Sequence, residues 1–179
     1  AEQFYHIGIC RSCHGGRFAP KLLTTLLAGK NIAEVSALSL AALEAYAGSV
    51  PETLPEVMRP MARKLMGELA EGIAPLLALG LSYLSLDRGG GTLSTGELQR
   101  VQLARTLRSE TTGVLYVLDE PSIGLHPQNA EGLTDVFSRL REQGNSLVVV
   151  DHDIDILRQA DWLIEMGVGA GENGGRVIA

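Results

Sequence analysis

Gly113-Val-Leu-Tyr-Val-Leu-Asp-Glu-Pro121 is the stretch that decides the fold of this 179-residue chain. It is a short, continuous apolar run that ends in two carboxylates, Asp119 and Glu120. Continuous apolar runs are typical of buried parallel strands, and parallel sheets place such acids at their carboxyl edge, where nucleotides bind. The run therefore predicts an α/β fold in which Asp119 holds Mg²⁺ through water and Glu120 polarises an attacking water.

The residues that follow predict a βαβ unit. Pro127 suits the first turn of a helix, and the apolar residues after it share one helical face. These residues are Leu133, Val136, Phe137 and Leu140. Gly144 is placed to end the helix, and residues 146–151 form a second apolar run. Because parallel strands joined by a helix end at the same sheet edge, His152 is expected near Glu120.

A glycine-containing segment lies upstream, before a stretch that favours a helix over residues 97–108. Ser94 and Gly96 stand where that helix would begin. Free N–H groups and the positive dipole end make a helix start suitable for a phosphate, and glycine permits close backbone approach. An ordinary N-cap would use the same residues. The carboxylate strand downstream favours the phosphate interpretation.

These motifs stand in the order of an ABC-type ATPase, and the chain resembles the excinuclease A (UvrA) family. Leu93-Ser-Thr-Gly-Glu97 is similar to the ABC signature, Val117-Leu-Asp-Glu120 to the Walker B strand, and Ser122-Ile-Gly-Leu-His126 to the D-loop. The resemblance makes His152 the switch histidine, which senses the γ-phosphate. It also implies nucleotide contacts, some made in trans to ATP on the opposite half. The implied contact residues are Leu93, Ser94, Thr95, Gly96, Glu97, Ser122 and Gly124.

Two further segments resemble UvrA proteins in particular: Cys10-Arg-Ser-Cys13-His-Gly-Gly-Arg17 and Met166-Gly-Val-Gly-Ala-Gly171. The sequence of the D-loop-like segment is similar to that in the first of the family's two ATPase halves. Thr95 and Leu98 replace the commoner Gly and Ala, as in shorter UvrA-like paralogues, which leaves a UvrB-type partner open.

The resemblance implies ATP-dependent recognition of damaged DNA in nucleotide excision repair. It further implies ATP and Mg²⁺ as cofactors and a second ATPase half, or a dimer mate, as partner. Two other interpretations stay open at this point. One is a soluble ABC ATPase that serves transport or antibiotic resistance, and the other is an inactive scaffold half.

The sequence contains no Gly-x-x-x-x-Gly-Lys-Ser/Thr loop, since the glycine runs at residues 89–91 and 169–171 lack the lysine. We therefore expect a fragment, a partial P-loop NTPase lobe that hydrolyses no ATP alone. Residues 1–88 are expected to form a mostly helical signature subdomain with half a zinc module. Residues 89–179 are expected to form the ABC ATPase lobe, in which further strands are predicted over residues 162–166 and 176–178.

Cys10 and Cys13 admit four interpretations. They match half of a four-cysteine zinc module, a c-type haem attachment site with His14, or a redox pair, and incidental thiols are a fourth possibility. Haem attachment would need export and an axial ligand, which nothing else in the sequence supports. The UvrA resemblance favours Zn²⁺, with two more ligands expected upstream.

Composition is typical of a soluble cytoplasmic protein. Hydrophobic residues make up 45% of the chain and aromatic residues 4%, and no apolar run is long enough for a membrane helix. The formal net charge is −6. Basic residues exceed acidic ones in residues 1–64, and acidic ones predominate after that. Any DNA contact is therefore expected from the amino-terminal part or from other chain, because phosphate neutralisation needs clustered Lys and Arg.

Overall fold

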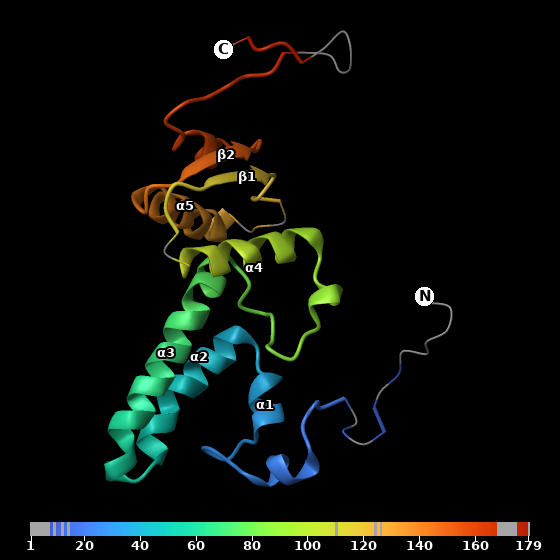
Figure 1. Cartoon of the computed structure of the whole chain (residues 1–179), viewed down its shortest axis with the longest axis vertical. Helices are drawn as coiled ribbons and strands as arrows, with labels where there is room; N and C mark the ends of the chain where they lie inside the picture. The colour runs from blue at the N-terminus through green and yellow to red at the C-terminus, as the bar shows by residue number, and fades with distance from the viewer. Residues whose placement is uncertain are drawn as a thin grey trace. The chain divides into compact units, whose positions relative to one another are not determined.

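The computed structural model describes residues 8, 10, 11, 13, 15–109, 111–123, 125, 127–167 and 175–178, with the backbone alone for 127–130. The chain divides into two compact units, Ala1–Leu98 and Gln99–Ala179 (Figure 1). Helices together with a parallel pair of strands confirm the predicted mixed α/β class. Within the described ranges, no helix is long and apolar enough to cross a membrane.

The first unit is built from helices and short 3₁₀ turns. Its α-helices are α1 (Ile32–Ser36), α2 (Leu40–Ser49) and α3 (Arg59–Ala78). Its 3₁₀ turns are η2 (Pro20–Thr24), η3 (Val50–Thr53), η4 (Glu56–Met58) and η5 (Gly90–Thr92). The Asn31 side chain begins α1 in a reciprocal capping box with Glu34, and Ser39 caps α2.

The core of this unit lies where α2 packs against α3. Leu43, Leu79 and Leu81 have no exposed surface. After α3 the chain returns along α2, because the Leu40 amide donates to the Leu84 carbonyl at 2.7 Å. The Asp87 amide likewise donates to the Ser36 carbonyl at 3.1 Å. These bonds fix the loop that carries the residues preceding α4.

Helix α4 (Thr95–Leu107) starts in the first unit and continues into the second. The second unit then contains β1 (Leu115–Asp119), α5 (Pro127–Glu142), β2 (Ser146–Val150) and α6 (Ile154–Leu157). The two strands are parallel, with Leu115 opposite Ser146 and Asp119 opposite Val150. The predicted βαβ unit is therefore confirmed.

Only one face of this sheet is covered by the described residues. Leu118 is buried on the side of α5, whose Leu133, Val136 and Leu140 are buried as predicted. The residues of the opposite face alternate with these and are exposed. They are Leu115, Val117, Val148 and Val150.

The strands predicted over residues 162–166 and 176–178 are wrong. The structure forms only an isolated antiparallel bridge between Met166 and Val177, and Trp162 is 90% exposed. A strand needs a neighbour to accept and donate its backbone hydrogen bonds. The apolar run of residues 162–166 does not pair with β1 or β2. Residues 168–171, the end of the UvrA-like segment that begins at Met166, lie outside the described residues.

Candidate functional site

The carboxyl edge of the sheet presents the two acids of the apolar run. The Glu120 amide extends the ladder by donating to the Val150 carbonyl at 2.7 Å, and the Glu120 carbonyl accepts from the Ile123 amide at 3.0 Å. Glu120 has a φ of 44°, in the left-handed region that non-glycine residues rarely adopt. Asp119 and Glu120 are both exposed. Their oxygens are therefore available to a hard cation and to water.

Asp151, which follows β2, is a residue that the sequence analysis did not single out. Its side chain is fully buried. Its carboxylate accepts hydrogen bonds from the Ser122 hydroxyl at 2.6 Å and the Ser122 amide at 3.1 Å. It also accepts from the amides of His152 at 2.7 Å and Asp153 at 3.0 Å. Asp151 thus connects Ser122 of the D-loop-like segment to the backbone of His152 and Asp153.

These hydrogen bonds decide the ionisation of Asp151. Burial raises the pKa of the carboxyl, but the bonds from Ser122, Asp153 and His152 together hold that pKa below its ordinary value. The only sequence signal for this role is a polar residue directly after an apolar run, just before His152.

His152 lies just beyond β2, and Asp119 is opposite Val150, the last residue of that strand. Asp119, Glu120 and His152 therefore stand at one edge of the sheet. The His152 side chain is 76% exposed, with Nδ1 3.9 Å from Asp151 Oδ1. The backbone nitrogen of His152 is therefore fixed while its ring faces solvent. Gly124 and His126 of the D-loop-like segment lie outside the described residues.

The start of α4 contains a reciprocal capping box between Glu97 and Ser94, in which Ser94 is the N-cap. The Ser94 amide donates to Glu97 Oε2 at 2.7 Å, and the Glu97 amide donates to Ser94 Oγ at 3.2 Å. Two remote residues join this box. The Tyr83 hydroxyl donates to Glu97 Oε1 at 2.8 Å, and Arg88 donates to both Glu97 oxygens at 3.2 Å.

Glu97 is only 6% exposed, although it is a charged residue. The Ser94 amide, followed by the Tyr83 hydroxyl, lowers the pKa of the Glu97 carboxyl to about 2, against the effect of burial and with help from the Arg88 charge. The carboxylate is therefore ionised throughout the physiological range. No sequence signal identified Tyr83 and Arg88, because their contact with Glu97 depends on the loop path.

The other residues of the signature-like segment lie nearer the surface. Ser94 and Thr95 are exposed, and Leu93 and Gly96 are half-buried. The first intrahelical bond runs from the Leu98 amide to the Ser94 carbonyl at 2.9 Å. The amides of Thr95 and Gly96 precede it, so the helix itself provides no carbonyl for them.

The cysteine pair lies in a turn near the start of the described chain. Cys10 is exposed and Cys13 half-buried, and the Gly16 amide donates to the Cys13 carbonyl at 2.8 Å. Across the residues whose positions are described, no group of three or more His, Cys, Asp and Glu side chains could hold a metal. The pair offers two thiol ligands of the four that a structural zinc needs.

Comparison with known proteins identifies the family. UvrABC system protein A from Thermus thermophilus is 47% identical over 178 residues, which is 99% of this chain and 19% of that protein. The Streptomyces coelicolor protein of the same name is 46% identical over 169 residues, 94% of this chain and 16% of that protein. The chain belongs to the UvrA family. It spans about a fifth of the length of these UvrA relatives.

The fold supports the same assignment. The crystal structure of UvrA2 from Deinococcus radiodurans superposes with a TM-score of 0.82 at 42% identity, covering 95% of this UvrA-family chain and 22% of that one. No protein-family model matches the chain. The resemblance to the UvrA family and the predicted partial ABC ATPase lobe are thus confirmed.

Proposed function

We propose that the complete protein is a UvrA-type ABC ATPase, located in the cytoplasm, that uses ATP hydrolysis to recognise damaged DNA in nucleotide excision repair. The observation that carries this proposal is the 47% identity to UvrABC system protein A over 99% of the chain. That span includes the signature-like segment, the strand with its two acids, the D-loop-like segment and His152.

At the sheet edge, we assign the metal and water roles to neighbouring residues. The Asp119 carboxylate holds Mg²⁺, and the Glu120 carboxylate polarises the attacking water. His152 senses the γ-phosphate with an exposed ring on a fixed backbone. Bound Mg²⁺ would supply positive charge that stabilises the transferred phosphoryl group. The exposure of both carboxylates supports these roles.

The signature-like segment is assigned to ATP held by a second ATPase half or a dimer mate. The amides of Thr95 and Gly96, which precede the first intrahelical hydrogen bond, and the exposed residue Ser94 suit a phosphate group. Ser122 and Gly124 are assigned to nucleotide contact because their segment resembles the ABC D-loop. Leu93 and Glu97 belong to the segment by sequence.

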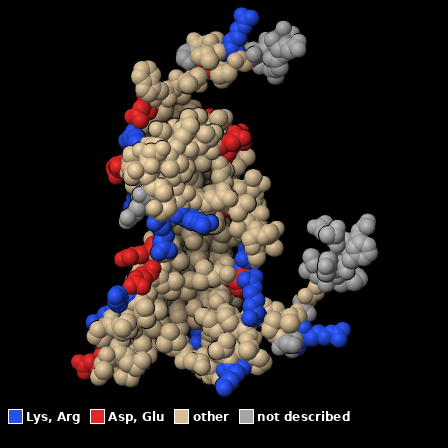
Figure 2. Space-filling model, viewed as in Figure 1, with Lys and Arg blue, Asp and Glu red and all other residues tan. Residues whose placement is uncertain are grey.

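Cys10 and Cys13 are assigned to Zn²⁺, with two further ligands from outside this chain. DNA is the macromolecular partner of the complete protein, and a UvrB-type protein is a further candidate partner. On the face in Figure 2, basic and acidic side chains are interspersed among a majority of other residues. DNA contact is assigned to the amino-terminal part of this chain, where basic residues exceed acidic ones, or to other parts of the protein, because phosphate neutralisation needs clustered Lys and Arg.

The proposed function is tested with the complete protein and with lesion-bearing and plain duplex DNA at fixed salt. DNA should change the ATPase rate. It should also change nucleotide affinity, and nucleotide should then change DNA affinity by the same factor, because linkage makes binding effects reciprocal. Lesion-bearing DNA should bind more tightly than plain DNA. If neither lesion nor nucleotide alters DNA affinity, and DNA leaves ATP turnover unchanged, the transport or resistance interpretation takes its place.

The 179 residues alone should not hydrolyse ATP, because Asp119, Glu120 and His152 lack a phosphate-binding loop in the same chain. A phosphate-release assay on the purified chain checks this expectation. Turnover at the rate of the complete protein, abolished by Glu120→Gln, would contradict it.

A further inference from the structure

The carboxylate of Glu97 has more partners than a helix cap requires. A capping box needs only the local exchange with Ser94, and its acid is commonly solvated. Here Tyr83 and Arg88 add hydrogen bonds from the loop that follows α3, and the carboxylate is buried. A charge is buried in this way only where partners compensate for lost hydration.

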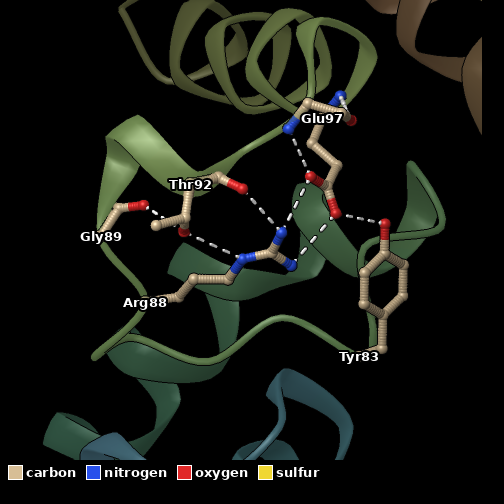
Figure 3. Close-up of polar contacts among 6 residues, drawn as sticks. Tyr83, Arg88, Gly89, Thr92 and Glu97 are labelled. Atoms are coloured by element: carbon tan, nitrogen blue, oxygen red, sulfur yellow. Dashed lines mark hydrogen bonds and ion pairs between the residues drawn. The ribbon is translucent and has the colours of Figure 1, made fainter.

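Arg88 forms hydrogen bonds to residues on both sides of Leu93-Ser94. Its Nη1 and Nη2 reach the two oxygens of Glu97, each at 3.2 Å (Figure 3). Its Nε donates to Thr92 Oγ1 at 3.3 Å, and Nη2 also donates to the Thr92 carbonyl at 3.0 Å. Thr92 Oγ1 in turn donates to the Gly89 carbonyl at 2.7 Å. One side chain therefore fixes both the turn before the signature-like segment and the helix after it.

The loop that carries Arg88 is anchored to the first unit. The neighbouring Asp87 donates its amide to the Ser36 carbonyl at 3.1 Å, and its carbonyl accepts from Arg17 Nη2 at 2.7 Å. Tyr83 is adjacent to Leu84, whose carbonyl is bonded to α2. The positions of Tyr83 and Arg88 are thus set by hydrogen bonds to other parts of the first unit.

From these contacts we propose that Tyr83 and Arg88 are positioning residues for ATP turnover, which act through Glu97 to hold the Ser94 to Gly96 backbone where it meets nucleotide. The inference rests on the proposed function, since it concerns the signature contact of the assembled ATPase. It gives Glu97 a supporting role in place of direct nucleotide contact.

The physical consequence is a separation of turnover from nucleotide affinity. Under the proposed function, ground-state affinity comes from a phosphate-binding loop, a motif that these 179 residues lack, and the signature-like segment contacts ATP held by the opposite half. Loosening the first turn of α4 should misplace the amides of Thr95 and Gly96 during turnover. Misplacements of about 1 Å cost up to roughly 10²-fold in rate.

The experiment uses the complete protein and the variants Arg88→Ala, Glu97→Gln and Tyr83→Phe. The matched control is Arg63→Ala, which removes the arginine of an exposed ion pair with Glu52 at 2.9 Å in the same unit. We measure kcat and KM for ATP, the affinity for a fluorescent ATP analogue, and hydrogen exchange of the α4 amides. Rates are normalised to folded protein.

For Arg88→Ala and Glu97→Gln, kcat should fall by about tenfold or more while KM and analogue affinity change less than about twofold. The loss in their double variant should be smaller than the product of the two single losses, because both substitutions remove the Arg88–Glu97 contact. Tyr83→Phe, which deletes one hydroxyl and keeps the ring, should lower kcat by roughly threefold. Arg88→Lys should restore the rate only in part, because lysine cannot form the paired contact. Arg63→Ala should match the wild type.

A kcat within about twofold of wild type in all three variants overturns the inference, as does a loss that disappears after normalisation to folded protein. Faster exchange at the start of α4 without a change in kcat also overturns it, since Glu97 would then be a helix cap only. A wild-type protein without ATP turnover overturns the proposed function as well. The wild-type arm therefore separates the two failures.

Discussion

Two regions of the molecule use carboxylates in opposite ways. At the start of α4, Glu97 is 6% exposed and accepts hydrogen bonds from Ser94, Tyr83 and Arg88. At the end of β1, Asp119 and Glu120 are exposed. A carboxylate whose lone pairs are occupied by protein donors fixes the backbone around it, whereas an exposed one keeps capacity for a cation or water. The surroundings of each acid, more than its place in a motif, indicate its role.

Replacing an exposed acid gives the sharpest test of this difference. Glu120→Gln in the complete protein should lower ATP turnover by roughly 10²- to 10⁴-fold, because it removes the carboxylate that polarises water. Nucleotide binding should persist, since Asp119 remains for Mg²⁺. Steady-state turnover and equilibrium nucleotide titration check this, with exposed Glu142→Gln of α5 as the control. Equal loss of nucleotide binding and turnover would show that Glu120 supports the structure of the site and does not act on water.

A buried acid should show the reverse pattern. Asp151→Asn should destabilise the 179-residue chain by about 1–3 kcal/mol, because an amide cannot accept from Ser122, His152 and Asp153 as the carboxylate does. Chemical denaturation measures the loss, and hydrogen exchange should locate it at the amides of Ser122 and His152. The control is Asp155→Asn, whose side chain is 76% exposed. Similar losses in the two variants would contradict a supporting role for Asp151.

Local patterns in the sequence predicted the parts of the fold that depend on local physics. The helical stripe through Leu133, Val136 and Leu140 and the two apolar runs were found because their periodicity reflects burial. The strands over residues 162–166 and 176–178 were predicted wrongly from the same kind of pattern. An apolar run shows a preference for burial, but pairing requires a neighbouring strand that the described chain does not supply.

The supporting residues of the site could not be predicted for a related reason. Arg88 meets Glu97 because the loop after α3 is bonded along α2, and Asp151 meets Ser122 because β1 and β2 are adjacent. Both contacts depend on tertiary structure that no short pattern encodes. The sequence singled out Asp119, Glu120 and His152 because they stand at the ends of apolar runs, and their catalytic roles stay predictions.

Ionisation of Glu97 provides a test that depends on pH. The pKa of this carboxyl is lowered from 4.5 to about 2 in the folded chain, so its stabilising contribution is complete above pH 4.5 and is lost as the pH falls toward 2. The unfolding free energy should therefore fall less steeply in Glu97→Gln than in the wild type between those values. Urea titrations at a series of acidic pH values check this. Identical slopes would mean that Glu97 keeps an ordinary pKa.

The smallest effect is expected at an ion pair that resembles the Arg88 contact but lacks its burial. Arg63 and Glu52 lie 2.9 Å apart with side chains 62% and 60% exposed, whereas Glu97 is 8% exposed at its side chain beside Arg88. Water and salt screen the exposed pair, so Arg63→Ala should change the unfolding free energy little, and even less at high salt. Arg88→Ala should cost more, because it leaves a buried carboxylate with fewer donors. Denaturation of both variants at low and high salt compares them directly. Equal costs would show that burial does not separate the two ion pairs. The contrast between carboxylates that accept from protein donors and exposed carboxylates would then rest on Asp119 and Glu120 alone.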